Sequence, residues 1–269
     1  MPTYAVIGAT RGVGLEIVRQ LAANPDNTVF ATARNVEKSL HLAKVIQEAP
    51  AKNVVALQVD VVDHRSLKVA AEKIAQATGG ALDVLIHNAA KMDYANGNLY
   101  RSLTEYESMD ALDAEFIEAF KVNTLGAIHS VDAFLPLLRK GSTKKIVIIS
   151  TDGGERDVVW KTGTTILAAY CVTKSAENMV MTKYAAELVD EGFIVAAISP
   201  GVVDVSGTAA SPPSAAEVAD LKRAIDGIRK KKSNQIEKPS TPEQSVKKVL
   251  EVVYSLGPQD TATYRSVQG

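Results

Sequence analysis

The chain has few of the features that mark secreted and membrane-spanning proteins. Its 269 residues include one cysteine, Cys171, which excludes an internal disulfide framework and favours a reducing compartment. No run approaches the ~20 apolar residues that cross a bilayer, and no basic segment precedes the first apolar run, Tyr4 to Ile7. We therefore expect a cytoplasmic protein with no secretory signal and no membrane partner.

An excess of charge of one sign is also absent. Lys and Arg number 30, Asp and Glu number 31, and the formal net charge is -1. Nothing in this balance recruits nucleic acid, so we expect no nucleic-acid partner. The four histidines show no metal-ligand spacing with the cysteine or with paired carboxylates, and we assign no metal. They are His41, His64, His87 and His129.

What the chain does have is a regular alternation of strand-length apolar runs and segments of helical period. Continuous β-branched runs are typical of strands buried on both faces of a parallel sheet. Strands are predicted at Tyr4–Ile7, Thr28–Thr32, Val54–Val59, Val84–Ile86, Ile146–Ile149, Ile194–Ile198 and near Thr261–Val267. Helices are predicted at Gly12–Ala23, Arg65–Ala77, Asp113–Leu138, Ala168–Glu191 and Pro242–Ser255. The pattern predicts a single α/β domain over residues 1–269, with one doubly wound sheet and right-handed crossovers.

Two segments depart from this alternation, near 91–112 and 202–240. The first is polar and rich in Tyr and Asn; the second carries a Ser-Pro-Pro sequence, a predicted helix from Ala215 to Arg229, and a basic run ending at Lys232. Both follow the carboxyl ends of predicted strands, where open α/β sheets bind ligands. We interpret them as substrate walls and a lid, with surface decoration as the alternative. The basic run alone is more typical of a solvated helix end.

A glycine-rich loop links the first strand to the first helix with the spacing G-x-x-x-G-x-G. Gly8 and Gly12 permit backbone geometry that a Cβ would obstruct, and Gly14 allows the helix to pack closely on the strand. Free N–H groups at the helix start then face a pyrophosphate together with the positive end of the helix dipole. The expected contacts come from Gly8, Thr10, Arg11, Gly12, Val13 and Gly14.

Arg34 stands at the end of the second strand, beside the expected adenosine ribose. An acidic residue there would accept hydrogen bonds from a free 2′-hydroxyl, whereas a guanidinium suits a 2′-phosphate. No carboxylate stands at this strand end, and Arg11 can approach the same phosphate. The pattern therefore favours NADP(H), with a surface arginine as the alternative.

The ends of the third and fourth strands add further candidate cofactor contacts. Asp60, followed by Val61, could accept a hydrogen bond from an adenine amino group or could cap its own loop. Asn88 and Ala89 place small residues beside the cofactor and an amide that can join neighbouring strands.

Tyr170 and Lys174 lie at i and i+4, on one face of a predicted helix. Reduction of a ketone needs a proton for the developing alkoxide, and a free tyrosine, which titrates at about 10, exchanges protons poorly at neutral pH. An ammonium and an oxidised nicotinamide nearby would both favour the phenolate. The pair therefore suggests a proton donor tuned by a neighbouring cation.

Polar residues near this pair complete a candidate catalytic set. Ser150 and Thr151 follow the fifth strand, where a hydroxyl can hold a substrate carbonyl or simply make a turn. Asn123 lies inside a long helical pattern, where it could perturb the helix and position a relay water or be a satisfied core amide. Cys171 adjoins Tyr170 but points in a different direction, so we expect it to pack.

Together these motifs resemble the short-chain dehydrogenase/reductase family over essentially the whole chain. They are Gly8-x-x-x-Gly12-x-Gly14, Asp60, Asn88-Ala89-Ala90, Asn123, Ser150-Thr151, Tyr170-x-x-x-Lys174 and Pro200-Gly201. The resemblance implies a Rossmann-type sheet of about seven mostly parallel strands, a Tyr-Lys-Ser-Asn catalytic set, and cofactor contacts that extend to Pro200, Gly201 and Val203. Within the family the chain is most similar to NADPH-dependent carbonyl reductases and fungal norsolorinic acid ketoreductase-like proteins.

The chain departs from the family pattern at several positions. Ile7 stands where Thr is usual, and the family's catalytic Ser aligns with Thr151, which leaves the choice between Ser150 and Thr151 open. Val205 replaces a Thr that meets the carboxamide, so Ser206, Thr208 or backbone atoms must serve. An insertion around Asp157 to Thr164 carries Trp160, a candidate pocket residue.

The resulting hypothesis is NADPH-dependent reduction of a ketone or aldehyde on a small-molecule carbonyl substrate, which Tyr170 protonates and Thr151 or Ser150 orients. The alternatives are a non-catalytic NADP sensor on the same fold, and an alcohol or steroid dehydrogenase working in the oxidative direction. The resemblance also implies a homodimer or homotetramer, paired through Asp113–Leu138 and Ala168–Glu191.

Overall fold

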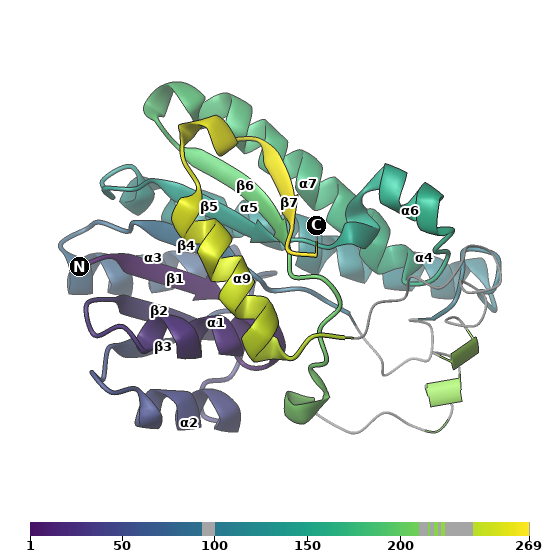
Figure 1. Cartoon of the computed structure of the whole chain (residues 1–269), viewed down its shortest axis with the longest axis horizontal. Coiled ribbons are helices and arrows are strands. Elements are labelled where there is room, and N and C mark those ends of the chain that lie inside the picture. The colour runs from purple at the N-terminus through teal and green to yellow at the C-terminus, as the bar shows by residue number, and fades with distance from the viewer. Residues whose placement is uncertain (93–99, 210–214, 216–217, 220–221, 224–238, 269) are drawn as a thin grey trace.

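The computed structural model describes residues 1–92, 100–209, 215, 218–219, 222–223 and 239–268 (Figure 1). Most of the helix predicted from Ala215 to Arg229, and the basic run after it, therefore lie outside the described residues. Within them one sheet has the strand order β3-β2-β1-β4-β5-β6-β7, and every neighbouring pair is parallel. The strands are β1 (Thr3–Ile7), β2 (Thr28–Ala33), β3 (Val54–Gln58), β4 (Val84–His87), β5 (Lys145–Ile149), β6 (Ile194–Ser199) and β7 (Thr263–Ser266). The prediction of one doubly wound α/β sheet is confirmed.

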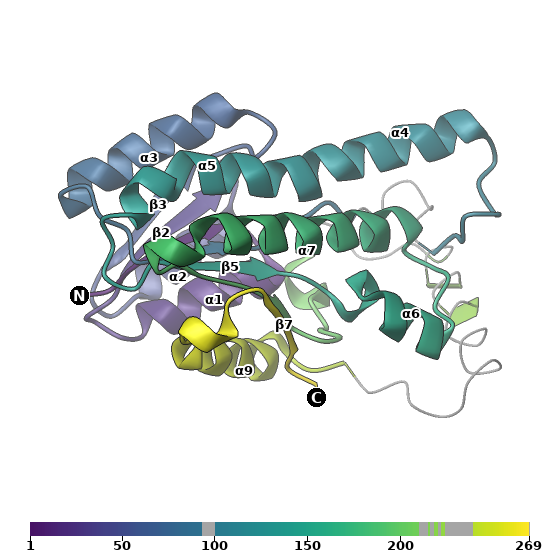
Figure 2. The ribbon, with the colours of Figure 1, turned by 90° about the horizontal axis from the view of Figure 1, so that it is seen from above.

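Helices cover both faces of the sheet (Figures 1 and 2). One core cluster joins the sheet to α1, α2 and α9, and a second joins the opposite face to α3, α5 and α7. Alternate residues of β1 enter each core: Val6 packs in the first and Ala5 and Ile7 in the second. The helices are α1 (Gly12–Ala22), α2 (Leu40–Glu48), α3 (His64–Thr78), α4 (Met109–Ala119), α5 (Gly126–Leu138), α6 (Arg156–Thr162), α7 (Ala168–Leu188) and α9 (Pro242–Ser255).

The long helix predicted over Asp113–Leu138 is divided by a π-helical segment, Phe120–Leu125, which lies between α4 and α5. Asn123 is inside this segment, in keeping with the expectation that it perturbs the helix. Wider turns of this kind are frequent at functional sites. Two helices were not predicted, α2 and the short α6, and α4 begins four residues earlier than expected.

A close approach between α1, β1 and β4 fixes the start of the first helix. The side-chain amide of Asn88 donates to the Gly8 carbonyl at 2.8 Å. This hydrogen bond joins the end of β4 to the end of β1. A Cβ at position 14 would lie 2.1 Å from that same carbonyl oxygen and 2.3 Å from Asn88 Nδ2. Gly8 itself has a φ of 84°, in the region that favours glycine. The three residues therefore form one tight junction.

We expect Gly14→Ala to destabilise the protein by about 1–3 kcal/mol, because the added methyl must displace backbone rather than a flexible side chain. The matched control is Gly207→Ala, where an added Cβ would meet nothing within 4 Å. Chemical denaturation of both variants tests this, and equal stabilities would contradict the tight junction.

Candidate active site

Parallel pairing brings the carboxyl ends of the strands to one edge of the sheet, where ligands bind in open α/β folds. The predicted site residues that follow these ends are the glycine loop after β1, Arg34 after β2, Asp60 and Val61 after β3, Asn88 and Ala89 after β4, Ser150 and Thr151 after β5, and Pro200, Gly201 and Val203 after β6. Tyr170 and Lys174 are both on α7, within its first two turns. The fold thus gathers the motifs along one edge.

The start of α1 has the chemistry of an anion site. Arg11 at the N-cap makes no side-chain capping hydrogen bond, and the first turn contains no acidic residue. The Gly12 N–H donates to the Thr208 hydroxyl at 2.9 Å, and a Cβ at Gly12 would lie 3.2 Å from Val205. The residues after β6 therefore reach back over the glycine loop. Thr208 supplies a hydroxyl there, one of the alternatives left open by the loss of the usual Thr at Val205.

Two arginines stand at the part of the edge where the sequence predicts the adenosine of a cofactor. Arg11 and Arg34 are both exposed. Asp60 accepts from the backbone N–H of Val62 at 3.1 Å, which is the loop-capping role that the sequence left open. The carbonyl oxygen of Val61 lies 2.9 Å from His129 Nδ1, which anchors this loop to α5.

The two hydroxyls after β5 have different surroundings. Ser150 is buried and donates to Asn178 Oδ1 at 2.6 Å, and Asn178 in turn donates to Glu155 Oε1 at 2.7 Å. Thr151 is half-buried, and its oxygen accepts from the Gly153 N–H at 3.2 Å. No acceptor for the Thr151 O–H is found among the described residues. Ser150 is therefore committed to a structural bridge, while Thr151 keeps a proton to donate.

The turn that follows Thr151 is anchored from β7 and from α7. Tyr264 donates to Asp152 Oδ1 at 2.6 Å, and burial together with this bond raises the pKa of the Tyr264 phenol. A Cβ at Gly153 would lie 2.7 Å from the Cys171 sulfur. Burial raises the pKa of the Cys171 thiol to about 11, so this side chain packs as a neutral group.

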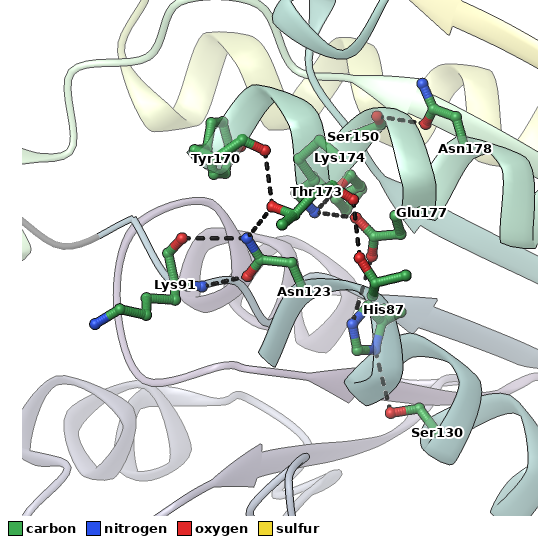
Figure 3. A network of polar contacts seen from close by, with 12 residues as sticks. His87, Lys91, Asn123, Ser130, Ser150, Tyr170, Thr173, Lys174, Glu177 and Asn178 are labelled. Carbon is green, nitrogen blue, oxygen red and sulfur yellow. Dashed lines mark hydrogen bonds and ion pairs between the residues drawn. The ribbon is translucent and has the colours of Figure 1, made fainter. Parts of the chain in front are cut away.

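Lys174 is a buried cation of the candidate site. Its side chain is 1% exposed, and Nζ donates to the Ile149 carbonyl at 2.7 Å and lies 2.6 Å from Glu177 Oε2 (Figure 3). Because Ile149 ends β5, this bond ties α7 to the strand that leads into Thr151. Tyr170 lies one helical turn before Lys174 and is half-buried.

Asn123 is fully buried and bridges two segments (Figure 3). Its Oδ1 accepts from the Lys91 N–H at 2.6 Å, and its Nδ2 donates to Thr173 Oγ1 at 2.9 Å. Thr173 lies beside Lys174 on α7. The amide is therefore satisfied by protein groups, and it links the segment after β4 to the helix that carries the Tyr-Lys pair.

Sequence reasoning did not single out Glu177 or the environment of His87. Both side chains are fully buried, and His87 Nε2 lies 3.6 Å from Glu177 Oε1. The available signal was a charged residue three positions after Lys174, on the same helix face. Trp160, expected near the pocket, lies on α6 and is 82% exposed.

The described residues contain neither a candidate metal site nor a candidate membrane-spanning helix. No group of three or more His, Cys, Asp or Glu side chains lies close enough to hold a metal ion. No helix combines the length and the apolar character needed to cross a membrane.

Comparisons with known proteins agree on one family. The family model described as short chain dehydrogenase matches residues 3–215. The short-chain dehydrogenase/reductase atnB of Arthrinium is 40% identical over 217 residues, 80% of this chain and 79% of the relative. AacuF of Aspergillus aculeatus, with the same description, is 35% identical over 94% of this chain and 92% of its own length. The solved NADPH-bound carbonyl reductase from chicken fatty liver has the same fold, with a TM-score of 0.76 over 100% of this chain and 97% of that one, at 23% identity.

We expect the Ser150–Asn178 bridge to contribute about 1 kcal/mol to stability. In a double-mutant cycle, Ser150→Ala and Asn178→Ala should show a coupling energy of that order, because each removes the same hydrogen bond. The control cycle pairs Asn178→Ala with Ser39→Ala, on the opposite face of the sheet, and should be additive within about 0.5 kcal/mol. Additivity in the first cycle would contradict the bridge.

Proposed function

Because the chain belongs to the short-chain dehydrogenase/reductase family of oxidoreductases, we propose that it catalyses the NADPH-dependent reduction of a ketone or aldehyde to an alcohol. The observation that carries this proposal is the confinement of the Lys174 ammonium beside β5, one turn from the Tyr170 phenol. Among fold neighbours, carbonyl reductases from chicken liver and Drosophila melanogaster support the choice of a carbonyl substrate.

A nicotinamide dinucleotide suits the residues at the carboxyl edge of the sheet. Gly8 and Gly12 have φ values of 84° and 58°, and Gly14 has no room for a Cβ, so the loop offers backbone rather than side chains. The first turn of α1 carries no carboxylate that would repel a pyrophosphate. Further contacts are proposed from Thr10, Val13, Asp60, Val61, Asn88, Ala89, Pro200, Gly201 and Val203.

The preference for NADP(H) is proposed from Arg34 and Arg11. Both side chains are exposed at the edge, after β2 and within the glycine loop, where a 2′-phosphate would form charge-assisted hydrogen bonds with them. The residue after Arg34 is Asn35, so no carboxylate competes at this strand end.

The bound cofactor supplies the hydride, and the protein handles the proton. Tyr170 donates its phenolic proton to the carbonyl oxygen while Thr151 holds that oxygen by a hydrogen bond. Lys174 binds the nicotinamide ribose, and its positive charge stabilises the Tyr170 phenolate that forms. Asn123 keeps the segment after β4 in place, where a relay water would restore the proton.

Exposed apolar residues of α4, the π-helical segment and α7 support the proposal of a homodimer or homotetramer. Ile117 and Phe120, at the end of α4 and beyond it, and Val172 and Met179 of α7 are large apolar residues that are 42–61% exposed. Exposed apolar surface of this kind is typical of protein contacts. A cytoplasmic location and a fungal-type aromatic or polyketide substrate complete the proposal.

We expect Tyr170→Phe to lower kcat by at least about 10²-fold, because it removes the proton donor and keeps the ring. NADPH affinity, measured by fluorescence titration, should change little. Tyr254→Phe, on the exposed part of α9, is the matched control and should keep full activity. If the protein is instead a non-catalytic cofactor sensor, the wild type and both variants should bind NADPH, and none should reduce any member of a broad panel of ketones and aldehydes.

We expect Arg34→Ala to weaken NADPH binding by about 10- to 100-fold, the equivalent of one charge-assisted hydrogen bond, and to leave NADH binding nearly unchanged. Calorimetric titration with each cofactor measures both constants. Arg139→Ala, which removes an exposed arginine paired with Glu191, is the control. Equal losses for NADPH and NADH would show that Arg34 does not contact the 2′-phosphate.

A further inference from the structure

Four buried side chains form a polar chain that runs inward from Lys174 (Figure 3). Lys174 Nζ lies 2.6 Å from Glu177 Oε2, and Glu177 Oε1 lies 3.6 Å from His87 Nε2. His87 Nδ1 lies 3.2 Å from Ser130 Oγ. None of the four side chains is more than 1% exposed. These four side chains therefore link α7, β4 and α5 without contact with solvent.

The direction of these hydrogen bonds assigns the proton of the His87 ring. The Ser130 hydroxyl donates to the Gly126 carbonyl at 2.8 Å, so its oxygen accepts from His87 Nδ1. The Nδ1–H tautomer leaves a lone pair on Nε2, facing Glu177 Oε1. Neither of these two atoms has a hydrogen-bond partner among the described residues. An ionised Glu177 would thus place two acceptors against each other in a buried space, which is unfavourable.

A proton on Glu177 removes this conflict, since a protonated carboxyl can donate toward His87 Nε2. We propose that Glu177 and His87 are positioning residues that hold one proton between them behind Lys174, and that this proton decides whether the Lys174 ammonium is balanced by a carboxylate. The effect on catalysis rests on the proposed function. With the proton present, the full charge of Lys174 acts on Tyr170; without it, the Glu177 carboxylate offsets that charge.

The electrostatics of the pair agree with this geometry. Burial raises the pKa of Glu177 to about 7, and Lys174 opposes that shift. Burial and then the charge of Lys174 lower the pKa of His87 to about 3. Between about pH 3 and pH 7, the proton therefore resides on Glu177, and His87 is a neutral acceptor.

The groups around Glu177 leave this assignment intact. Among the described residues, the titratable side chains in contact with it are Lys174 from its own helix and His87 from β4. Asp152, from the turn after β5 that packs on α7, bonds to Tyr264 instead. Glu118, from α4, pairs with Lys91. Ser130 of α5 and Asn123 of the π-helical segment carry no group that titrates between pH 3 and 8.

The first test measures stability against pH and needs no cofactor. The pKa of Glu177 is raised from 4.5 to about 7, so its contribution to stability is present below pH 4.5 and is lost as pH rises to about 7. The pKa of His87 is lowered from 6.5 to about 3, so its contribution is present above pH 6.5 and is lost as pH falls to about 3. Between pH 4.5 and pH 6.5, the contributions of Glu177 and His87 to stability change with pH in opposite directions, so they cancel in the wild-type protein.

Single variants should separate these opposed effects. Between pH 4.5 and 6.5 the unfolding constant of His87→Asn, relative to wild type, should rise with pH by up to about tenfold per unit, and that of Glu177→Gln should fall by up to the same factor. Glu72→Gln, exposed on α3, is the matched control and should keep a constant ratio. If the unfolding constants of both variants, relative to wild type, stay constant with pH or change in the same direction, the proposal that Glu177 and His87 hold one proton is wrong.

The second test uses activity. Wild-type kcat/KM for carbonyl reduction should fall as pH rises through about 7, whereas Glu177→Gln, which keeps a neutral group of the same shape, should stay level across that range. If Glu177→Gln instead lowers kcat/KM by the same factor at every pH, Glu177 has a purely structural role and does not control the charge that acts on Tyr170. If the opposed stability slopes appear and wild type reduces no carbonyl compound, the proposed function fails while the shared proton stands.

Discussion

The buried ammonium of Lys174 determines where the other residues of the candidate site lie. The Lys174 ammonium is removed from water, so protein oxygens must replace its hydration. The Ile149 carbonyl and Glu177 do so, and the first of these can act only if α7 lies against the end of β5. Tyr170, one turn earlier on α7, is then held at the same edge as Thr151. The need to satisfy one charge thus positions the phenol and the hydroxyl together.

The sheet and most helices could be predicted from the sequence because their apolar patterns are strong. All seven strands were placed to within three residues at each end. The unpredicted helices lack such a signal: α2 buries only Leu42 and Val45, and α6 has no buried residue. The helix predicted at Asp113–Leu138 is interrupted at the segment where Asn123 bonds to Lys91 and Thr173, and no local pattern encodes contacts between such distant parts of the chain.

The candidate site was predictable where motifs coincide with strand ends. The contacts that separate Ser150 from Thr151 were not, because Asn178 is 28 positions away from Ser150. Glu177 was missed for a related reason: a glutamate on a helix is usually solvated, and only the packing of α7 against β4 and α5 shows that this one is buried. The Rossmann-type fold could therefore be predicted from local patterns, whereas the electrostatic surroundings of Lys174 required tertiary structure.

The strand order has a consequence for synthesis of the chain. After β4 has paired with β1, each later strand adds beside the one made just before it, so the sheet can extend at one edge as the polypeptide emerges. The junction of Gly8, Gly14 and Asn88 can form once β4 is in place, whereas the turn after Thr151 gains its Tyr264 anchor only when β7 has been made. A nascent protein would thus complete the start of α1 well before the turn beside Thr151.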